Sequence, residues 1–402
     1  MERSTHHYSP AYSSRAADLM GTVMQIAREI APRAEEIDAQ RFLPQDIARR
    51  FAEAGLYDLL KPRLYGGLET HPQVFLDIIE HLATVSGSAA WCAFIGATSA
   101  YCIAYLQEDE VRRSFDQAGL IMAGVFAPRG RAVAASVKGV RGFRVQGRWS
   151  WASGARNADF VIGGCLEMDA AGKPLLLPNG KPQVRSMVFS SSDITLLDTW
   201  QASGLCGSGS GDFEVKDIFV PEARTFSLFT DRPLGTPLYS FPVFGLLSLG
   251  IAAVCLGLAR NAIDTLVALA QDKRPDGSSK LLADSSAAQI DVAEAEALVR
   301  SARAYLLQTL NAAWDAASAV GVMGLSHRRD VRHATTHAVR SAARAVDLMY
   351  HRGGGSAVFK SSPLQRHFRD VHVATQHIMV SEATQVLTGR LFLGLPTETL
   401  ML

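Results

Sequence analysis

Two histidines, His372 and His377, lie five residues apart near the C-terminus, in the segment RDVHVATQH. An imidazole can donate or accept a proton near neutral pH, and it is a common metal ligand. Apolar periodicity predicts that both histidines lie on one helix, where this spacing separates them by about 140° around the axis. They need not share a face, so their roles can differ.

The segment GRWSWASGARNADFVIGG, residues 147–164, holds a second set of groups suited to a ligand. Trp149 and Trp151 are two residues apart in a predicted strand, so they are expected on the same face. Either they belong to the core, or they form an aromatic wall for a planar ligand that Ser153 or a neighbouring backbone amide hydrogen-bonds. The pattern alone leaves both interpretations open.

No metal site is predicted. His333 and His337 are four residues apart, but no third ligand accompanies them. The same segment carries a run of arginines that predicts a charged helix face, with contact to a phosphate as the alternative. These arginines are Arg328, Arg329, Arg332, Arg340 and Arg344.

The composition is that of a globular protein with a large core. Of 402 residues, 48% are apolar and 20% charged, with a net charge of +1. This balance gives no electrostatic reason to expect nucleic acid or a membrane surface as partner. The apolar run 243–259 is shorter than the ~20 residues of a membrane span, which favours a buried helix. The five scattered cysteines and the absence of a secretion signal at the N-terminus predict a cytoplasmic protein with reduced thiols.

Three segments of the chain, which differ in their hydrophobic periodicity, must position these groups. Helical periodicity runs from about 14 to 118, short β-rich segments separated by turn residues from about 120 to 226, and long helical segments from about 240 onward. We therefore expect a helical domain (1–118), a central antiparallel β-domain (119–228), barrel or sandwich, and a C-terminal helical bundle (229–402). No strand–GxGxxG–helix unit is present, so the chain is expected to lack a nicotinamide-binding domain of its own.

The order of these blocks, together with GRWSWASGARNADFVIGG, resembles the acyl-CoA dehydrogenase superfamily of flavoproteins. Three more segments resemble parts of that superfamily in the same order: FAPRGRA (126–132), SGLCGSGSGDFEVKDIFVPE (203–222) and RGGGSAVFKSSPLQRHFRDVH (352–372). The resemblance implies an α+β, mostly α fold of this type, whose C-terminal domain is a four-helix bundle. It also implies a homotetramer.

The residue beside His377 separates two chemistries within the superfamily. Many of the dehydrogenases carry a base, a glutamate, nine residues after the arginine of RD; counted from Arg369, that position is Ile378. The sequence is more similar to the two-component flavin monooxygenases, which take reduced flavin from a separate NAD(P)H-dependent reductase. That resemblance implies that FMNH2 or FADH2 reacts with O2 to form a C4a-(hydro)peroxyflavin. A His377 imidazolium would stabilise or protonate it, and Ser153 would lie near flavin N5.

The resemblance also implies which residues form the site. His377 and Ser153 would be catalytic. The residues expected to contact the flavin are Trp151, Ser153, Ala127, Arg274, Gly354, Gly355, Arg369, His372 and His377. Arg274 aligns with an arginine that commonly contacts the flavin diphosphate of a neighbouring subunit. Pocket candidates are Thr98, Ser99 and Tyr101; Ser99 stands where many of these monooxygenases have a second active-site histidine.

The leading hypothesis is a monooxygenase that oxygenates a small aromatic or heteroatom-containing substrate. One alternative is an acyl-CoA dehydrogenase-like FAD oxidoreductase acting on CH–CH groups. The other is a non-catalytic helical assembly protein that retains the fold.

Overall fold

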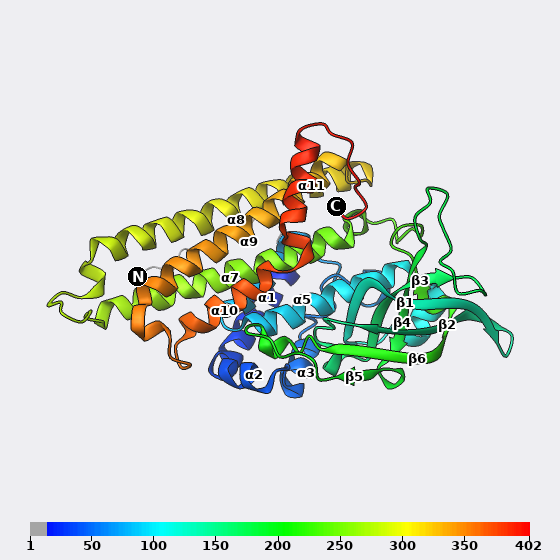
Figure 1. Cartoon of the computed structure of the whole chain (residues 1–402), viewed down its shortest axis with the longest axis horizontal. Coiled ribbons are helices and arrows are strands. Elements are labelled where there is room, and N and C mark those ends of the chain that lie inside the picture. Colours follow the sequence, from blue (N-terminus) through cyan, green and yellow to red (C-terminus); the bar gives the residue numbers. More distant parts are fainter. Residues whose placement is uncertain (1–13) are drawn as a thin grey trace.

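A computed structural model describes residues 14–402, with helices at both ends of the chain and a sheet between them (Figure 1). The N-terminal helices are α1 (Ser14–Ile30), α2 (Ala34–Gln40), α3 (Gln45–Glu53), α4 (Pro72–Ala83), α5 (Gly87–Tyr101) and α6 (Glu108–Ser114). Helix α5 begins where the Ser86 hydroxyl accepts a hydrogen bond from the Ala89 N–H (3.2 Å). All residues of α5 are buried, because other elements surround it.

One seven-stranded sheet follows. Its strands are β1 (Met122–Val137), β2 (Val140–Trp149), β3 (Phe160–Met168), β4 (Val184–Ser190), β5 (Thr195–Leu197), β6 (Asp212–Pro221) and β7 (Thr225–Phe226), in the order β5-β6-β2-β1-β3-β4-β7. Neighbouring strands are antiparallel, as expected, except β1 and β3, which are parallel. They are parallel because the chain returns from β2 to the far side of β1. The pairing of β1 with β3 shifts register between Val125 and Gly130, so Phe126 and Ala127 lie in an irregular stretch.

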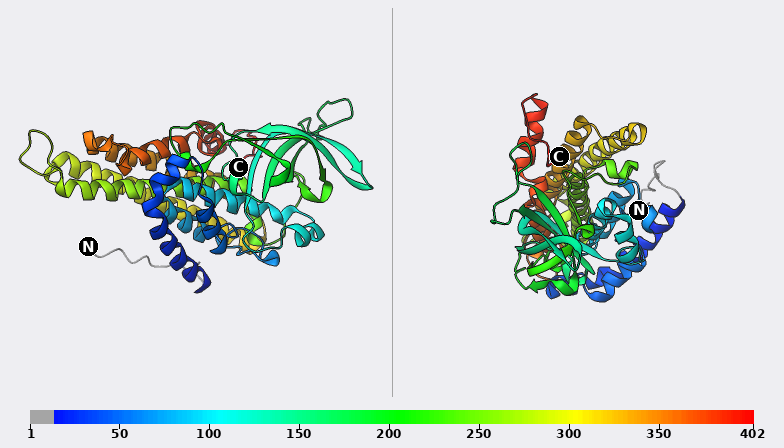
Figure 2. Two further views of the ribbon diagram at one scale, coloured as in Figure 1. Left: turned by 90° about the horizontal axis from the view of Figure 1, so that it is seen from below. Right: turned by 90° about the vertical axis from the view of Figure 1, so that its right-hand side faces the viewer.

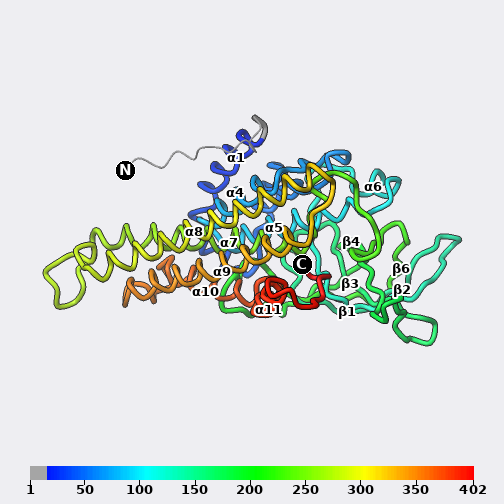
Figure 3. The backbone as a smooth tube through the Cα atoms, turned by 90° about the horizontal axis from the view of Figure 1, so that it is seen from above, coloured from blue at the N-terminus to red at the C-terminus, as the bar shows by residue number. Residues whose placement is uncertain are grey.

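The C-terminal helices are α7 (Val243–Asp272), α8 (Ser286–Val320), α9 (Leu325–Gly353), α10 (Pro363–Thr375) and α11 (Glu382–Phe392). Helices α7, α8 and α9 run side by side, α10 lies along them, and α11 crosses their end nearest the sheet (Figures 1 and 3). The predicted order of a helical domain, a central β-domain and a C-terminal helical bundle is confirmed.

Two helical stretches, Gly87–Tyr105 and Val243–Asp272, are long and apolar enough to cross a membrane. Their most apolar windows are 100% and 94% buried inside the fold, so both act here as core helices. Helix α7 packs against α4, α5, α9 and α10, which explains its apolar surface on all sides.

Helix α5 joins the two halves of the molecule, because it packs against both α7 and β1. The sheet lies at one end of the elongated molecule, and the bundle extends away from it (Figure 2). The residues predicted to do chemistry come from the loop after β2, from α5 and from the segment after α10.

Candidate functional site

The loop after β2 separates the two tryptophans. Trp149 is fully buried; its Nε1–H donates to the Gly164 carbonyl (2.7 Å), and its ring stacks on Phe213 with centroids 4.7 Å apart. Trp151 has a left-handed backbone (φ 68°), and its side chain is 65% exposed. The prediction that they share a face is wrong, because the strand ends at Trp149 and its alternation ends with it. Trp149 is core, and Trp151 presents a free indole.

Ser153 lies in a buried chain of hydroxyl groups. Its Oγ accepts a hydrogen bond from the Trp91 indole N–H (3.0 Å) and shares another with the Ser210 hydroxyl (2.6 Å). Ser210 in turn bonds the Ser208 hydroxyl (2.7 Å). An indole N–H can only donate, so Ser153 must accept from Trp91 and keeps its own proton available for donation.

His377 does not lie on a helix, contrary to expectation. Helix α10 ends at Thr375, and His377 starts the next 3-10 turn, where its Nδ1 accepts a hydrogen bond from the Met379 N–H (3.2 Å). Its ring lies edge-on to the Trp91 ring, with centroids 6.0 Å apart. Trp91 therefore touches both residues predicted to be catalytic, although they are more than 200 positions apart in the chain.

The charge state of His377 also differs from expectation. Burial, reinforced by the nearby Arg332 cation, lowers the pKa of His377 to about 4. The imidazole is therefore neutral at physiological pH, not an imidazolium. Since Nδ1 accepts from a backbone N–H, the proton belongs on Nε2, which has no partner among the described residues. His377 thus offers one N–H donor.

No carboxylate replaces the missing dehydrogenase base. Ile378, at the position of that base, is exposed. Glu382, one turn further on, is also exposed in the first turn of α11.

His372 and Arg369 make contacts within the protein. His372 Nε2 lies 2.8 Å from an Asp347 carboxylate oxygen on α9. Arg369 donates to Asp38 on α2 (3.0 Å) and to the Ser203 carbonyl. These contacts explain both side chains as links between elements, whereas a flavin role had been expected for each.

Asp370, next to Arg369, fastens the segment that leads to Ser208 and Ser210. Its buried carboxylate accepts a hydrogen bond from the Leu205 N–H (2.6 Å). Gly204 fits against this helix only without a side chain, since a Cβ there would lie 2.3 Å from the Arg369 carbonyl oxygen. Helix α10 therefore holds the serine segment in place.

Arg274, Gly354 and Gly355 lie at the other end of α10. Lys273 joins their two loops, donating to the Gly353 carbonyl (2.6 Å) and the Ser356 hydroxyl (2.9 Å). Helix α10, 13 residues long, separates these loops from His377 by roughly 20 Å at 1.5 Å per residue. The structure brings the candidate phosphate-binding residues together, but away from Trp91 and Ser153 of the same chain.

The three pocket candidates differ in their surroundings. Thr98 bonds the Phe94 carbonyl of its own helix (2.9 Å), and the Tyr101 hydroxyl donates to the Phe241 carbonyl (2.6 Å). Both are buried and satisfied within the core. Only Ser99 faces β1, where a Cβ on Gly124 would lie 3.5 Å from its hydroxyl.

Aromatic side chains that the sequence analysis did not single out gather beside β1. Phe244, on the first turn of α7, lies edge-on to Phe126 (centroids 6.2 Å) and tilted to Phe229 (6.5 Å). Phe126 directly precedes Ala127, the predicted flavin contact, which is half-buried in the irregular stretch of β1. The sequence did contain a signal for Phe126, since this residue lies in FAPRGRA, the segment that resembles the end of a flavin-and-substrate strand.

Arg332 was expected on a charged helix face, and this is wrong. It is only 2% exposed, because its helix α9 is packed between α7 and the 3-10 turn after His377. Its spacing relative to the other arginines does not distinguish it from them. Only the packing of α9 shows that Arg332 is buried.

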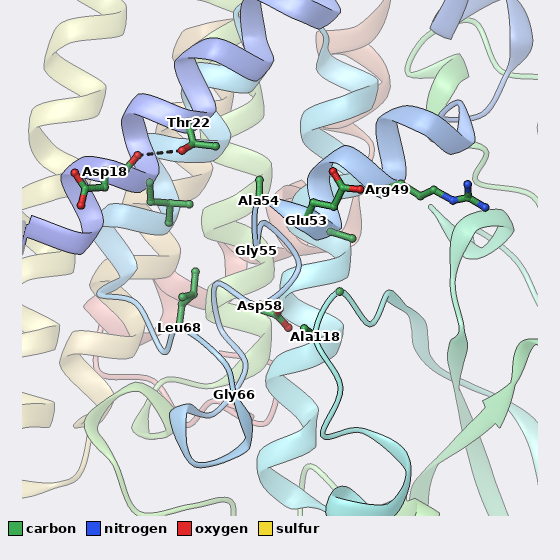
Figure 4. A pocket seen from close by; sticks show the side chains of 13 residues that line it. Asp18, Thr22, Arg49, Glu53, Ala54, Gly55, Asp58, Gly66, Leu68 and Ala118 are labelled. Carbon is green, nitrogen blue, oxygen red and sulfur yellow. Dashed lines mark hydrogen bonds between the residues drawn. The ribbon is translucent and has the colours of Figure 1, made fainter.

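A surface cavity lies in another part of the molecule. It has a volume of about 650 Å³, and Figure 4 shows its lining, with Asp18 and Thr22 of α1 opposite Glu53 of α3 and the loop at Asp58. None of the predicted site residues lines it.

The groups around Trp91 fit a flavin ring. A neutral imidazole N–H and a serine hydroxyl are donors of the kind that the oxygen and nitrogen acceptors of a flavin need, and the exposed Trp151 indole is a planar surface. Among the described residues, no group of three or more metal-ligating side chains competes with this interpretation.

Comparison with known proteins points in the same direction. Residues 18–115 match the acyl-CoA dehydrogenase N-terminal domain, and residues 249–382 match the C-terminal domain. The chain is 32% identical to an indole-3-acetate monooxygenase of Pseudomonas putida over 89% of each chain. It is 26% identical to the oxygenase subunit HsaA, a flavin-dependent monooxygenase of Mycobacterium tuberculosis, over 95% of this chain and 96% of that one. The structure of XiaF from a Streptomyces species, in complex with FADH2 and glycerol, superposes with a TM-score of 0.86 at 26% identity, covering 96% of this chain and 98% of XiaF.

Proposed function

Since the chain belongs to the flavin-dependent monooxygenases of the acyl-CoA dehydrogenase superfamily, we propose that Trp91, Ser153 and His377 form the centre at which it oxygenates a small aromatic substrate. It uses reduced flavin from a separate reductase, together with O2. The observation that carries the proposal is the position of Trp91, which hydrogen-bonds Ser153 and contacts the ring of His377.

Each residue of this centre has a distinct task. Trp91 fixes the Ser153 hydroxyl by donating to it, so Ser153 can direct its own proton toward a ligand or toward Ser210. His377 presents a neutral N–H donor at Nε2 without adding charge. Trp151, Ser153, Ala127 and His377 would hold the flavin ring, which when bound supplies the electrons that activate O2. Fixed donors in a site from which water is excluded stabilise charge more than the same donors in water.

The surroundings of Phe244 support an aromatic substrate. Phe126 from β1, Phe229 from the segment after β7 and Phe244 from α7 converge from three parts of the chain. Aromatic rings pack well against one another edge to face. Heteroatom-containing substrates without an aromatic ring would use this cluster less well.

Dehydrogenation of an acyl thioester is the weaker candidate. That reaction needs a base to remove the α-proton, and the residue next to His377 is an exposed isoleucine. A neutral histidine with a pKa of about 4 is a poor base.

We expect the protein to be a homotetramer in the cytoplasm, to which an NAD(P)H-dependent flavin reductase supplies reduced flavin. Arg274, Gly354 and Gly355 then serve the flavin of an adjacent subunit, because α10 separates them from Trp91 in their own chain. Exposed apolar side chains around α11 are available for contacts between subunits. They include Ile378, Val386, Phe392, Leu393 and Leu395.

Turnover with ¹⁸O2 tests the proposed function. The purified protein is supplied with a flavin reductase, NADH, and FMN or FAD, and is offered small aromatic substrates beginning with indole-3-acetate. We expect one ¹⁸O atom in the product and NADH consumption that rises with substrate. If every aromatic compound leaves the reaction unlabelled while reduced flavin is lost to hydrogen peroxide, the proposal is wrong. Bleaching of bound oxidised FAD by an acyl-CoA would instead support dehydrogenation.

A further inference from the structure

Arg332 is a buried cation without an acid partner. It is 2% exposed, and no carboxylate of the described residues lies within ion-pair distance of it. Its sequence neighbour Asp330 pairs with Arg329 instead. A charged group without a counter-ion is costly to bury, so its position calls for an explanation beyond packing.

Within residues 14–402, contacts are made to only one side of the guanidinium. Nη1 donates to the Phe244 carbonyl (3.1 Å) and contacts the Met379 sulfur (3.4 Å). Nε is buried without an acceptor, and no described residue accepts from Nη2. The free edge, Nε with Nη2, has the spacing that binds both oxygens of a carboxylate at once.

This free edge belongs to the neighbourhood of His377. Arg332 contacts the sulfur of Met379, and the backbone N–H of Met379 donates to His377. Arg332 is also near enough for its charge to act on the His377 imidazole. The same Nη1 that contacts Met379 also donates to the carbonyl of Phe244, the residue at the centre of the aromatic cluster.

We propose that the free edge of Arg332 binds a carboxylate of the substrate, so that the enzyme selects small aromatic acids over their uncharged analogues. The aromatic part would pack against Phe126, Phe229 and Phe244, and the carboxylate would neutralise the buried cation. This assignment rests on the monooxygenase function proposed above and deepens it by naming the substrate class.

The test compares matched acids and amides, namely indole-3-acetate with indole-3-acetamide and phenylacetate with phenylacetamide. Each pair differs in charge but hardly in shape. In the wild-type enzyme, supplied with reductase, NADH and flavin, we expect kcat/KM for the acid to exceed that for the amide by at least about tenfold, or about 1.4 kcal/mol. Arg332→Gln is expected to bring this ratio near one by lowering turnover of the acid alone. Arg332→Lys should give an intermediate ratio, because it keeps the charge but loses the two-point edge.

Arg340→Gln is the matched control, since Arg340 lies on the same helix but is exposed. It removes the same charge and should leave the acid-to-amide ratio unchanged. An unchanged ratio in a folded, active Arg332→Gln enzyme overturns the proposal. So does an equal loss for both compounds together with weaker binding of reduced flavin, because Arg332 would then serve the flavin.

A binding measurement separates this assignment from the proposed function. Acids should raise the Tm of the wild-type protein more than the paired amides, and this difference should vanish in Arg332→Gln. If Arg332→Gln does not fold, equal Tm shifts by acid and amide in the wild type overturn the assignment. Absence of ¹⁸O from every product refutes the monooxygenase proposal, whereas ¹⁸O incorporation without preference for acids refutes only the role of Arg332.

Discussion

The difference between His372 and His377 lies in their surroundings. His372 pairs with Asp347, whereas His377 leaves the helix and turns its Nδ1 to a backbone N–H. Burial and the Arg332 cation disfavour a proton on His377, so its pKa falls to about 4. A neutral donor can stabilise charge developing on a bound ligand without the cost of burying a second cation beside Arg332.

We predict that His377→Ala lowers the rate of product formation by at least about tenfold and raises hydrogen peroxide release, because a fixed donor is lost. His372→Ala is the control and should change product formation by less than about threefold. Product formation and peroxide are measured in parallel with the reductase-coupled system. Equal losses in the two variants would contradict the assignment of the donor to His377.

The pH dependence of stability tests the charge state of His377. The pKa of His377 is lowered to about 4, so below about pH 6.5 the unfolded chain takes up a proton that the folded site excludes. This residue therefore costs stability as the pH falls from about 6.5 toward 4. His377→Gln should gain Tm relative to wild type between pH 7 and pH 5. A Tm difference that is constant with pH would mean that His377 titrates normally in the fold.

A third prediction concerns Trp91. Trp91→Phe keeps a ring beside His377 but removes the donor to Ser153. We expect a stability loss of about 1 kcal/mol and a larger fraction of reduced flavin lost to hydrogen peroxide. Trp314→Phe, which replaces an indole packed at a tilt against the His71 ring in another part of the protein, is the control. If both variants couple NADH to product equally well, Trp91 does not position Ser153.

At the scale of elements, α10 locks the serine segment to the bundle. Asp370 accepts from the Leu205 N–H, and Arg369 reaches both the Ser203 carbonyl and Asp38. The RD motif therefore has a structural role. It fixes the segment whose Ser210 hydroxyl is hydrogen-bonded to Ser153. Burial raises the pKa of Asp370 to about 7, although the Leu205 N–H opposes the shift.

This raised pKa predicts a pH-dependent contact. The folded protein holds a proton on Asp370 between about pH 4 and pH 7 that the unfolded chain releases, so this contribution is complete below about pH 4 and is lost as the pH rises through about 7. Asp370→Asn keeps an uncharged acceptor, so its Tm relative to wild type should increase as the pH rises from about 4 to 8.5. Parallel Tm curves for wild type and Asp370→Asn would show that Asp370 is already ionised at low pH.

At the scale of the whole molecule, the two ends of α10 carry different parts of the site. Trp91, Ser153 and His377 meet near the end of α10 that leads to His377, whereas Lys273 joins the loops of Arg274 and the glycines at its other end. Figure 1 shows the loops after α7 and α9 at the end of the bundle that is far from the sheet. The site that we propose to be assembled from two subunits would make use of both ends.

We predict that Arg274→Gln weakens binding of reduced flavin by about tenfold and leaves the rate at saturating flavin unchanged, since it removes a phosphate partner remote from the chemistry. Arg300→Gln, which alters an exposed arginine of α8, is the control. Co-expressed Arg274→Gln and Ser153→Ala chains should form mixed tetramers with more high-affinity active sites than either variant alone, if Arg274 acts on a neighbour's flavin. Mixed tetramers that merely average the two parents would place Arg274 in its own chain's site.

Much of the fold was predictable from local patterns. Periodicities of about 3.6 and 2 residues located the helical and β-rich blocks, and turn residues marked the breaks at 273–285 and 354–362, because these signals depend only on neighbouring residues. The motifs around Ser153 and Asp370 indicated the superfamily, and the missing glutamate at Ile378 indicated monooxygenation. None of these inferences requires knowing which distant residues touch.

The features of the site that could not be predicted depend on contacts between residues that are distant in the sequence. Nothing in the local sequence indicated that Trp151 would leave the strand, that His377 would be neutral, or that Arg332 would be buried while Arg340 and Arg344 on the same helix are exposed. Exposure, protonation and hydrogen-bond partners depend on which helices pack around a side chain, and local sequence does not encode that packing. The sequence by itself determined the family, the order of elements and the reaction class; only the tertiary structure joined Trp91 to Ser153 and His377 and left one edge of Arg332 free, because desolvation and hydrogen-bond geometry arise when α5, α7, α9 and the sheet come together.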